Sequence, residues 1–161
     1  MAIITLNNNS ISNITSLPTG VGGKVLQVVT ATDQTDRTTS STSFVTASNS
    51  LSVAITPSSA SSKIYIQLNA TCHINTTNVA RYYTIYRDST NLGNGNQGMT
   101  ALYAENNADP VVPLNIGFLD TPNTTSQIIY QPYFRTGVAG NAAWITWDQT
   151  KSSMTVFEIA G

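Results

Sequence analysis

A strict alternation of apolar and small polar residues, broken once by a serine-rich turn, constrains the fold of this chain more than any other feature. Leu51, Val53 and Ile55 alternate with small residues, and Pro57 and a run of serines end the pattern. The alternation then resumes over residues 64–70. A period of two residues sends every second side chain to the same face, which is typical of a half-buried β-strand. The segment therefore predicts two such strands around a polar turn.

Further segments of this kind follow one another along the chain, separated by turns rich in Asn, Asp, Gly and Pro. No segment has the 3.6-residue period of an amphipathic helix. Short strands at this spacing predict an all-β fold, a single antiparallel β-sandwich or jelly roll over residues 23–161. We expect strands at 24–31, 43–47, 51–56, 63–72, 80–87, 99–105, 111–119, 127–135, 143–148 and 153–160.

Pro113 and Pro132 fall inside two of the predicted strands. Because proline donates no hydrogen bond to a β-ladder, it is found at sheet edges and bulges. We therefore expect these strands to lie at an edge, to carry a bulge, or to face another subunit.

Residues 1–22 form a separate segment, in which aliphatic residues are spread among Asn, Ser and Thr ahead of a hinge that contains Gly and Pro. Termini fray unless something holds them, so a disordered tail is one interpretation. The recurring aliphatic side chains favour the other, an extended arm that anchors the protein to a sister subunit or a scaffold. The anchoring candidates are Ile3, Ile4, Leu6, Ile11, Ile14 and Leu17.

The composition limits the partners of the chain, whose 161 residues suffice for one domain with a stable core. Only 9% of the residues are charged, against about 25% in an average protein, so the surface must be polar but largely uncharged. The seven basic residues are scattered and the net charge is −1, whereas nucleic acid or an anionic membrane needs clustered positive charge, so neither partner is expected. The start of the chain has no basic segment followed by a long apolar run, so we expect no signal peptide or membrane span, and synthesis in a cytoplasm.

Residues Gly93-Asn-Gly95-Asn-Gln-Gly98 match the G-x-G-x-x-G pattern of dinucleotide-binding loops. That motif binds a pyrophosphate only where it follows a buried strand and opens a helix. Here the preceding strand is rich in Tyr and Arg and no helix follows. The motif therefore predicts an Asn/Gly hairpin loop, and we expect no cofactor.

The sequence offers few residues for a metal or catalytic site. Cys72 and His73 are adjacent, so on a strand they point to opposite faces and cannot readily share a metal or act as nucleophile and base. They are the only Cys and His of the chain, although a trimer could gather three copies of His73 on its axis. Most carboxylates lie in predicted turns, where Asp commonly serves as a turn residue. Two alternatives stay open: a glycosidase-like carboxylate pair, and a weak calcium site in the loop from Asn106 to Asp109.

Exposed aromatic side chains are the strongest candidates for a binding surface. Alternation places Tyr83 on one face of its strand and Tyr82 and Tyr86 on the other. It likewise places Trp144 and Trp147 on opposite faces. A Tyr or Trp ring offers a flat apolar face with a polar tip, which suits a subunit contact or stacking against a sugar. With core packing as the alternative for each, we expect interface or glycan contacts at Tyr82, Tyr86, Tyr133 and Trp147.

Several stretches together resemble small virion proteins of tailed bacteriophages. They are Gly-Lys-Val-Leu-Gln-Val at Gly23, Ile-Thr-Pro-Ser-Ser-Ala-Ser-Ser-Lys-Ile at Ile55, Arg-Asp-Ser-Thr at Arg87, Gly-Phe-Leu-Asp-Thr-Pro at Gly117 and the closing strand at 153–160. The resemblance covers nearly everything after residue 23. It implies a trimer-forming sandwich similar to the tumour necrosis factor fold, used on fibres, tail tips or capsid exteriors, and these families share no catalytic residues.

The resemblance and the uncharged composition together predict a non-enzymatic virion structural protein, made in the host cytoplasm. Its expected place is the capsid exterior, as a homotrimeric decoration protein of the cement or head-fibre type, bound to the major capsid protein or another virion protein. Many uncharged copies can crowd together without building up charge, and affinity would come from buried area and multivalency. The first alternative is a receptor-binding tip domain of a tail fibre that recognises host surface glycans, and the second is a small polysaccharide depolymerase.

Overall fold

The structure, a computed structural model, describes residues 24–75, 78–105 and 109–161. Neighbouring strands in this part of the chain pair antiparallel throughout. The elements are β1 (Val25–Asp33), β2 (Arg37–Thr39), β3 (Val45–Thr46), β4 (Val53–Ile55), β5 (Lys63–His73), β6 (Arg81–Arg87), β7 (Thr90–Asn91), β8 (Thr100–Leu102), β9 (Val111–Asp120), β10 (Ile128–Thr136), β11 (Ala143–Ile145), the short 3₁₀ helix η1 (Trp147–Gln149) and β12 (Ser152–Ile159).

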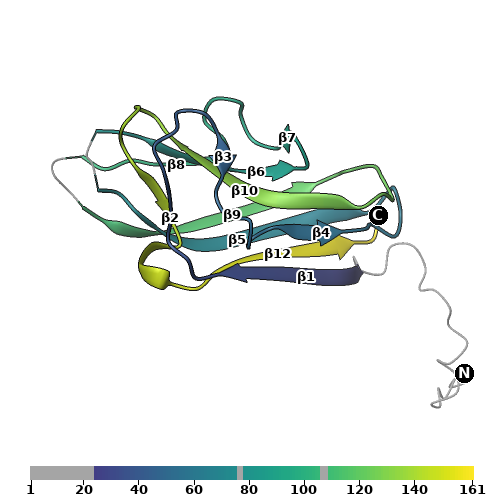
Figure 1. Cartoon of the computed structure of the whole chain (residues 1–161). Helices are drawn as coiled ribbons and strands as arrows, with labels where there is room; N and C mark the ends of the chain where they lie inside the picture. Colours follow the sequence, from purple (N-terminus) through teal and green to yellow (C-terminus); the bar gives the residue numbers. More distant parts are fainter. Residues whose placement is uncertain (1–23, 76–77, 106–108) are drawn as a thin grey trace, which may run out of the picture.

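The strands form a β-sandwich of two main sheets. One sheet has four strands in the order β1-β12-β5-β9. The other runs β3-β10-β6-β7, with β4 also paired to β10 and β8 to β6, while β2 and β11 form a separate pair. In Figure 1, β1 and β12 lie lowest and β6, β7 and β8 lie near the top. Strands that are distant in sequence are neighbours in both sheets, as in a jelly roll, and the predicted all-β antiparallel sandwich is confirmed.

The core lies between the two sheets, on the faces that the alternation predicts to be buried. Ile64, Ile66 and Leu68 of β5 have no exposed surface. They belong to the same apolar cluster as Tyr83 and Phe134 of the other sheet. Burying a side chain of this size contributes about 1.5–3 kcal/mol, so this cluster is the main source of stability.

Some elements differ from the sequence-based expectation. The strand expected at 143–148 ends at Ile145, because Thr146 has a left-handed φ of 60° and turns the chain into η1. β2 and β7 are additional strands of three and two residues, whose polar sequences show no alternation. The prediction for 143–148 is therefore wrong in its second half.

Both strand prolines lie beside an edge or an interruption. Pro113 is in β9, an edge strand of the four-stranded sheet. Pro132 is in β10, opposite the interval between β3 and β4, and its carbonyl accepts a hydrogen bond from the N–H of Ala47 at 2.8 Å. The expectation of an edge strand is confirmed for Pro113 and is wrong for Pro132, because β10 is a central strand that tolerates a proline where its partner on one side changes from β3 to β4.

A buried carboxylate, Glu158 of β12, fixes the serine-rich turn at one end of the sandwich. It accepts hydrogen bonds from Nε2 of Gln27 at 2.6 Å and from the backbone N–H and Oγ of Ser58, both at 2.7 Å. Burial alone raises the pKa of Glu158, but the hydrogen bonds from Gln27 and Ser58 outweigh it and lower the pKa to about 2. The turn is thus held against both β1 and β12.

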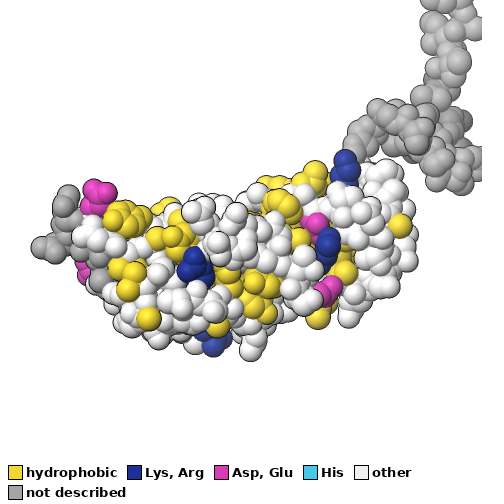
Figure 2. Space-filling model, turned by 90° about the horizontal axis from the view of Figure 1, so that it is seen from above, with side chains coloured by type: hydrophobic (Ala, Val, Ile, Leu, Met, Phe, Trp, Pro, Cys, Tyr) yellow, Lys and Arg dark blue, Asp and Glu magenta, His cyan; other side chains and the backbone are white. Residues whose placement is uncertain are grey.

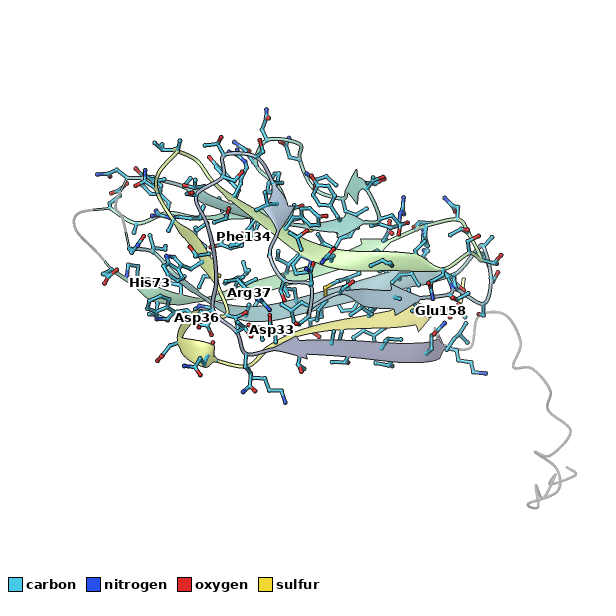
Figure 3. All side chains as sticks on the ribbon, in the orientation of Figure 1. Asp33, Asp36, Arg37, His73, Phe134 and Glu158 are labelled. Atoms are coloured by element: carbon cyan, nitrogen blue, oxygen red, sulfur yellow. The ribbon has the colours of Figure 1, made fainter. Side chains whose placement is uncertain are left out.

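Asp33, the last residue of β1, is a second buried carboxylate that holds neighbouring segments in place through hydrogen bonds. Its carboxylate accepts hydrogen bonds from Ser48 Oγ at 2.5 Å, from the Thr35 N–H at 2.9 Å and from Arg37 Nε at 3.1 Å. Burial raises its pKa, but the hydrogen bonds from Ser48, Thr35 and Arg37 outweigh burial and lower the pKa to about 2. Figure 3 shows Asp33 beside Arg37, well away from Glu158.

A third polar link joins the two sheets through two of the phage-like stretches. Nη1 of Arg87 donates to both carboxylate oxygens of Asp120, at 2.9 and 2.8 Å. Tyr130 Oη donates to Oδ2 of the same carboxylate at 2.7 Å. The Arg-Asp-Ser-Thr and Gly-Phe-Leu-Asp-Thr-Pro segments therefore meet in space.

Candidate functional site

Three of the four aromatic candidates share one surface, the outer face of the six-stranded sheet. Tyr86 stacks on Tyr133 with ring centroids 4.0 Å apart, and the Phe44 ring meets the edge of Tyr86 at 6.5 Å. The Arg135 guanidinium lies 4.2 Å from the ring centroid of Tyr82 and 5.4 Å from that of Phe44. We call this set the tyrosine face. Its composition confirms that Tyr82 and Tyr86 point outward, opposite to the buried Tyr83.

Packing within the tyrosine face changes the pKa of Tyr86. Burial raises the pKa of Tyr86, and the adjacent hydroxyl of Tyr133 raises it further.

The inner face of the same sheet holds Tyr83, whose hydroxyl donates to the Trp144 carbonyl at 2.8 Å. Burial raises the pKa of the Cys72 thiol to about 12. Cys72 is therefore a protonated core residue rather than a nucleophile.

The G-x-G-x-x-G segment folds over the edge of the tyrosine face as a hairpin loop. Asn94 and Gly98 exchange two backbone hydrogen bonds, at 2.9 and 2.8 Å. Arg135 Nε donates to the Asn96 carbonyl at 2.9 Å and so holds the loop on the sheet. Gly98 has a φ of 66°, and a Cβ there would lie 2.5 Å from the Tyr83 carbonyl. Gly93 and Gly98 thus serve close packing of a loop, as the hairpin interpretation predicts, whereas a Cβ at Gly95 would meet nothing within 4 Å.

A shallow hollow of about 340 Å³ lies beside Tyr82. Its polar side chains are the phenol of Tyr82, the amide of Gln97 and the hydroxyl of Thr100, and none of the side chains that line it is charged. The lining residues are Ala80, Tyr82, Gln97, Gly98, Met99, Thr100 and Ala101. An uncharged hollow with one ring can accept a neutral hydroxylated ligand.

The fourth candidate, Trp147, belongs to a separate group with His73, Asp109 and Trp144, which we call the tryptophan cluster. His73 stacks on Trp147 at 3.9 Å between ring centroids, and Trp144 packs edge-on against Trp147 at 4.8 Å. The expectation that Trp144 and Trp147 point to opposite faces is wrong, because the strand ends before Trp147. Nε2 of His73 lies 2.7 Å from Oδ1 of Asp109.

The tryptophan cluster holds two unusual features. Nδ1 of His73 and Nε1 of Trp144 are buried without a hydrogen-bond partner among the described residues, although buried polar atoms normally have one. The adjoining turn has positive φ at Thr146, Asp148 and Gln149, where non-glycine residues are strained. His73 is only 8% exposed, so its ring is not free to meet copies of itself on a trimer axis.

The outer face of the four-stranded sheet carries a row of apolar side chains that the sequence analysis did not single out. Val28, Phe157, Tyr65 and Leu119 are register partners across all four strands. Val28 is 54% exposed and Leu119 is 48% exposed. We call these four residues the outer row. The sequence signal that could have revealed the outer row is an apolar residue at an outward position of each of the four strands.

The tryptophan cluster and the start of β1 lie at opposite ends of the sandwich. The Lys24 carbonyl accepts a hydrogen bond from the Ala160 N–H at 2.9 Å, and Lys63, the first residue of β5, pairs with Ile159 beside them. His73 is the last of the 11 residues of β5, roughly 33 Å further along. Figure 3 shows His73 and Glu158 at the two ends. The six anchoring candidates, Ile3 to Leu17, lie outside the described residues.

On the face seen in Figure 2, Lys, Arg, Asp and Glu are few, and Lys and Arg gather into no basic patch. Within the described ranges, no three His, Cys, Asp or Glu side chains are placed to hold a metal ion together. No helix in the described part of the chain is long and apolar enough to cross a membrane. Of the proposed calcium loop, only Asp109 is described, and it pairs with His73.

No protein-family model matches the chain, and no curated protein matches it. Among solved structures, the chain is similar to the VP2 subviral particle of infectious bursal disease virus, at 19% identity and a TM-score of 0.45, covering 84% of this chain and 33% of that chain. It is also similar to a chain in the structure of the Gx strain of that virus, at 17% identity and a TM-score of 0.49, covering 100% of this chain and 37% of that chain. This chain spans about a third of the length of those chains. At such identities and TM-scores, nothing about what VP2 binds or does carries over to this chain.

Proposed function

We propose that this protein is a non-enzymatic virion structural protein of a tailed phage, a homotrimeric decoration protein of the cement or head-fibre type on the capsid exterior. Residues 1–22 anchor it to the major capsid protein, and the sandwich is its exposed head. The composition suits this place, since copies of a chain with only 9% charged residues and a net charge of −1 can be repeated at high density without strong repulsion.

The observation that carries the proposal is that the chain enters the sandwich at one end while the tryptophan cluster lies at the other. The chain enters the sandwich at Lys24, beside Ala160, whereas His73 and Trp147 lie at the opposite end. An anchor that precedes Lys24 would therefore leave the tryptophan cluster facing away from the capsid. This is the geometry that a projecting head requires.

The test is attachment of purified protein to particles that lack it. A full-length variant with Ser at Ile3, Ile4, Leu6, Ile11, Ile14 and Leu17 should lose co-sedimentation with the particles, because it loses the apolar side chains that would be buried. A matched control with Ser at Asn7, Asn8 and Asn9 changes the same segment without removing apolar surface and should still attach. Attachment of both variants would overturn the anchoring role.

A second candidate function, recognition of host glycans, is favoured by the uncharged hollow beside Tyr82. If it holds, purified protein should block phage adsorption to cells, and both Tyr82→Ala and Thr100→Val should reduce the block. Tyr103→Ala is the control, because Tyr103 is 53% exposed and does not line the hollow. Equal blocking by all three variants would reject this candidate.

A further inference from the structure

The outer face of the four-stranded sheet is partly apolar and almost free of charge. Next to the outer row, the register aligns Thr30, Thr155 and Gln67, and then Thr32, Ser153 and Asn69. Lys63, at one end, is the only Lys, Arg, Asp or Glu at the outward positions of these four described strands. Six of the nine most exposed large apolar residues of the described chain lie on these strands: Val25, Leu26, Val28, Tyr65, Val111 and Leu119. Such a concentration on one face marks an interaction surface.

We propose that this face is an interface between copies of the chain, with the outer row of one copy buried against a second copy. The inference rests on the self-association in the proposed function and names the surface that produces it. Hydroxyl and amide groups both donate and accept hydrogen bonds, so Thr155, Gln67 and Asn69 can pair with their own kind. A surface rich in one charge would instead repel its copy and select an oppositely charged partner.

The size of the face is sufficient for a stable contact. Four strands about 4.8 Å apart and about 30 Å long give a flat footprint on the order of 600 Å². A specific interface buries about 800 Å² of accessible surface per partner, and side-chain relief makes the accessible area larger than the footprint. One sheet face of this chain therefore provides the area that an oligomer needs.

The surface is also shaped to be covered. Gly117 lies directly under Tyr65, and a Cβ at Gly117 would lie 2.8 Å from Tyr65 Oη. The ring can therefore lie down on the sheet, with Phe157 beside it at 6.1 Å between centroids. Because the two rings lie low on the sheet, a second copy of the chain can approach it closely.

The experiment compares three exposed aliphatic positions, each changed to Glu in the full chain. Val28→Glu and Leu119→Glu place a carboxylate in the proposed interface, while Ile129→Glu is the matched control, 41% exposed on the other sheet. Sedimentation analysis over a concentration series should give the wild type and Ile129→Glu the mass of an oligomer, a multiple of 17.2 kDa. Val28→Glu and Leu119→Glu should raise the dissociation constant by about tenfold or more, because a carboxylate would be buried unpaired. Circular dichroism of each variant checks that the sandwich is intact.

A monomeric wild type would overturn the proposal, and so would oligomers that Val28→Glu and Leu119→Glu leave intact. If the wild type were monomeric and its outer row were protected from hydrogen exchange, residues 1–23 would be the occupant, which also overturns it. Capsid attachment is measured separately with the aliphatic-to-Ser variant. Oligomers formed through another face, together with intact attachment, would thus reject this interface and leave the decoration role standing.

Discussion

His73 is the single histidine of the chain, and its imidazole packs against both tryptophans of the sequence. The centroid of its ring lies 3.9 Å from that of the Trp147 ring. Because the chain has only two tryptophans, its tryptophan emission reports on this cluster alone.

We predict that His73→Ala changes the intensity and wavelength of tryptophan emission, because it removes the ring that stacks on Trp147. Tyr103→Ala is the control, because Tyr103 is exposed and outside the tryptophan cluster, and it should leave the emission unchanged. The measurement is steady-state fluorescence with excitation selective for tryptophan. Emission of His73→Ala that equals that of the wild type would contradict the prediction.

Glu158 illustrates how far a single residue can be predicted from sequence. It shares the inward face of β12 with Met154 and Val156, so the alternation does place this acid inside. Its partners could not be predicted, because Gln27 and Ser58 lie 131 and 100 residues away along the chain. Only the folded topology brings them together.

Replacing Glu158 by Gln should lower the free energy of unfolding by about 1–3 kcal/mol, because the hydrogen bonds that the carboxylate accepts are charge-assisted. The control is Glu105→Gln, which makes the same change at an exposed position and should stay within about 0.5 kcal/mol. Urea unfolding at neutral pH measures both. Equal effects of the two substitutions would show that Glu158 has no special role.

At the scale of the element, the strands with clear alternation were predictable and the others were not. The strand expected at 63–72 is β5, Lys63–His73, because its pattern is local. β2 has the sequence Arg-Thr-Thr and exists through pairing with β11, which no local pattern reveals. The error at Trp147 has the same origin, since the left-handed Thr146 breaks a pattern that the sequence alone continues.

Two of the three glycines of the 93–98 loop, Gly95 and Gly98, should respond differently to substitution by alanine. Gly98→Ala places a Cβ at positive φ and against the Tyr83 backbone, so we expect a loss of about 2 kcal/mol in unfolding free energy. Gly95→Ala meets nothing within 4 Å and should be neutral within about 0.5 kcal/mol. Thermal and urea unfolding measure the difference. A harmless Gly98→Ala would mean that the loop is not packed as described.

At the scale of the whole molecule, the fold class followed from periodicity and turn spacing, whereas the surfaces did not. The outer row takes one residue from each of four strands, so it exists only once the register is known. The tyrosine face combines β6 and β10 with Phe44, which precedes β3, for the same reason. The sequence predicted which kinds of residue would form these surfaces. Which residues lie side by side could be known only from the order of the strands in each sheet.

Stability of the whole molecule should fall in acid. Asp33 and Glu158 have folded-state pKa values lowered to about 2 from ordinary values of 3.8 and 4.5. A lowered folded-state pKa contributes stability above the ordinary value, and this stability is lost as the pH falls from about 4.5 towards 2. Urea midpoints measured between pH 7 and pH 2 should show that loss, and an Asp33→Asn, Glu158→Gln double variant should show a smaller one. A midpoint independent of pH in the wild type would contradict the prediction.

The pairing of β1 with β12 has a practical consequence for engineering. Because Lys24 and Ala160 are hydrogen-bonded neighbours, a sequence fused after Ala160 emerges beside Lys24. The turn at residues 137–141 follows the opposite end of β10, and Val138 in it is 52% exposed. With the proposed anchor at residues 1–22, an epitope inserted in that turn would point away from the capsid, so an insertion for display belongs in this loop and not at a terminus.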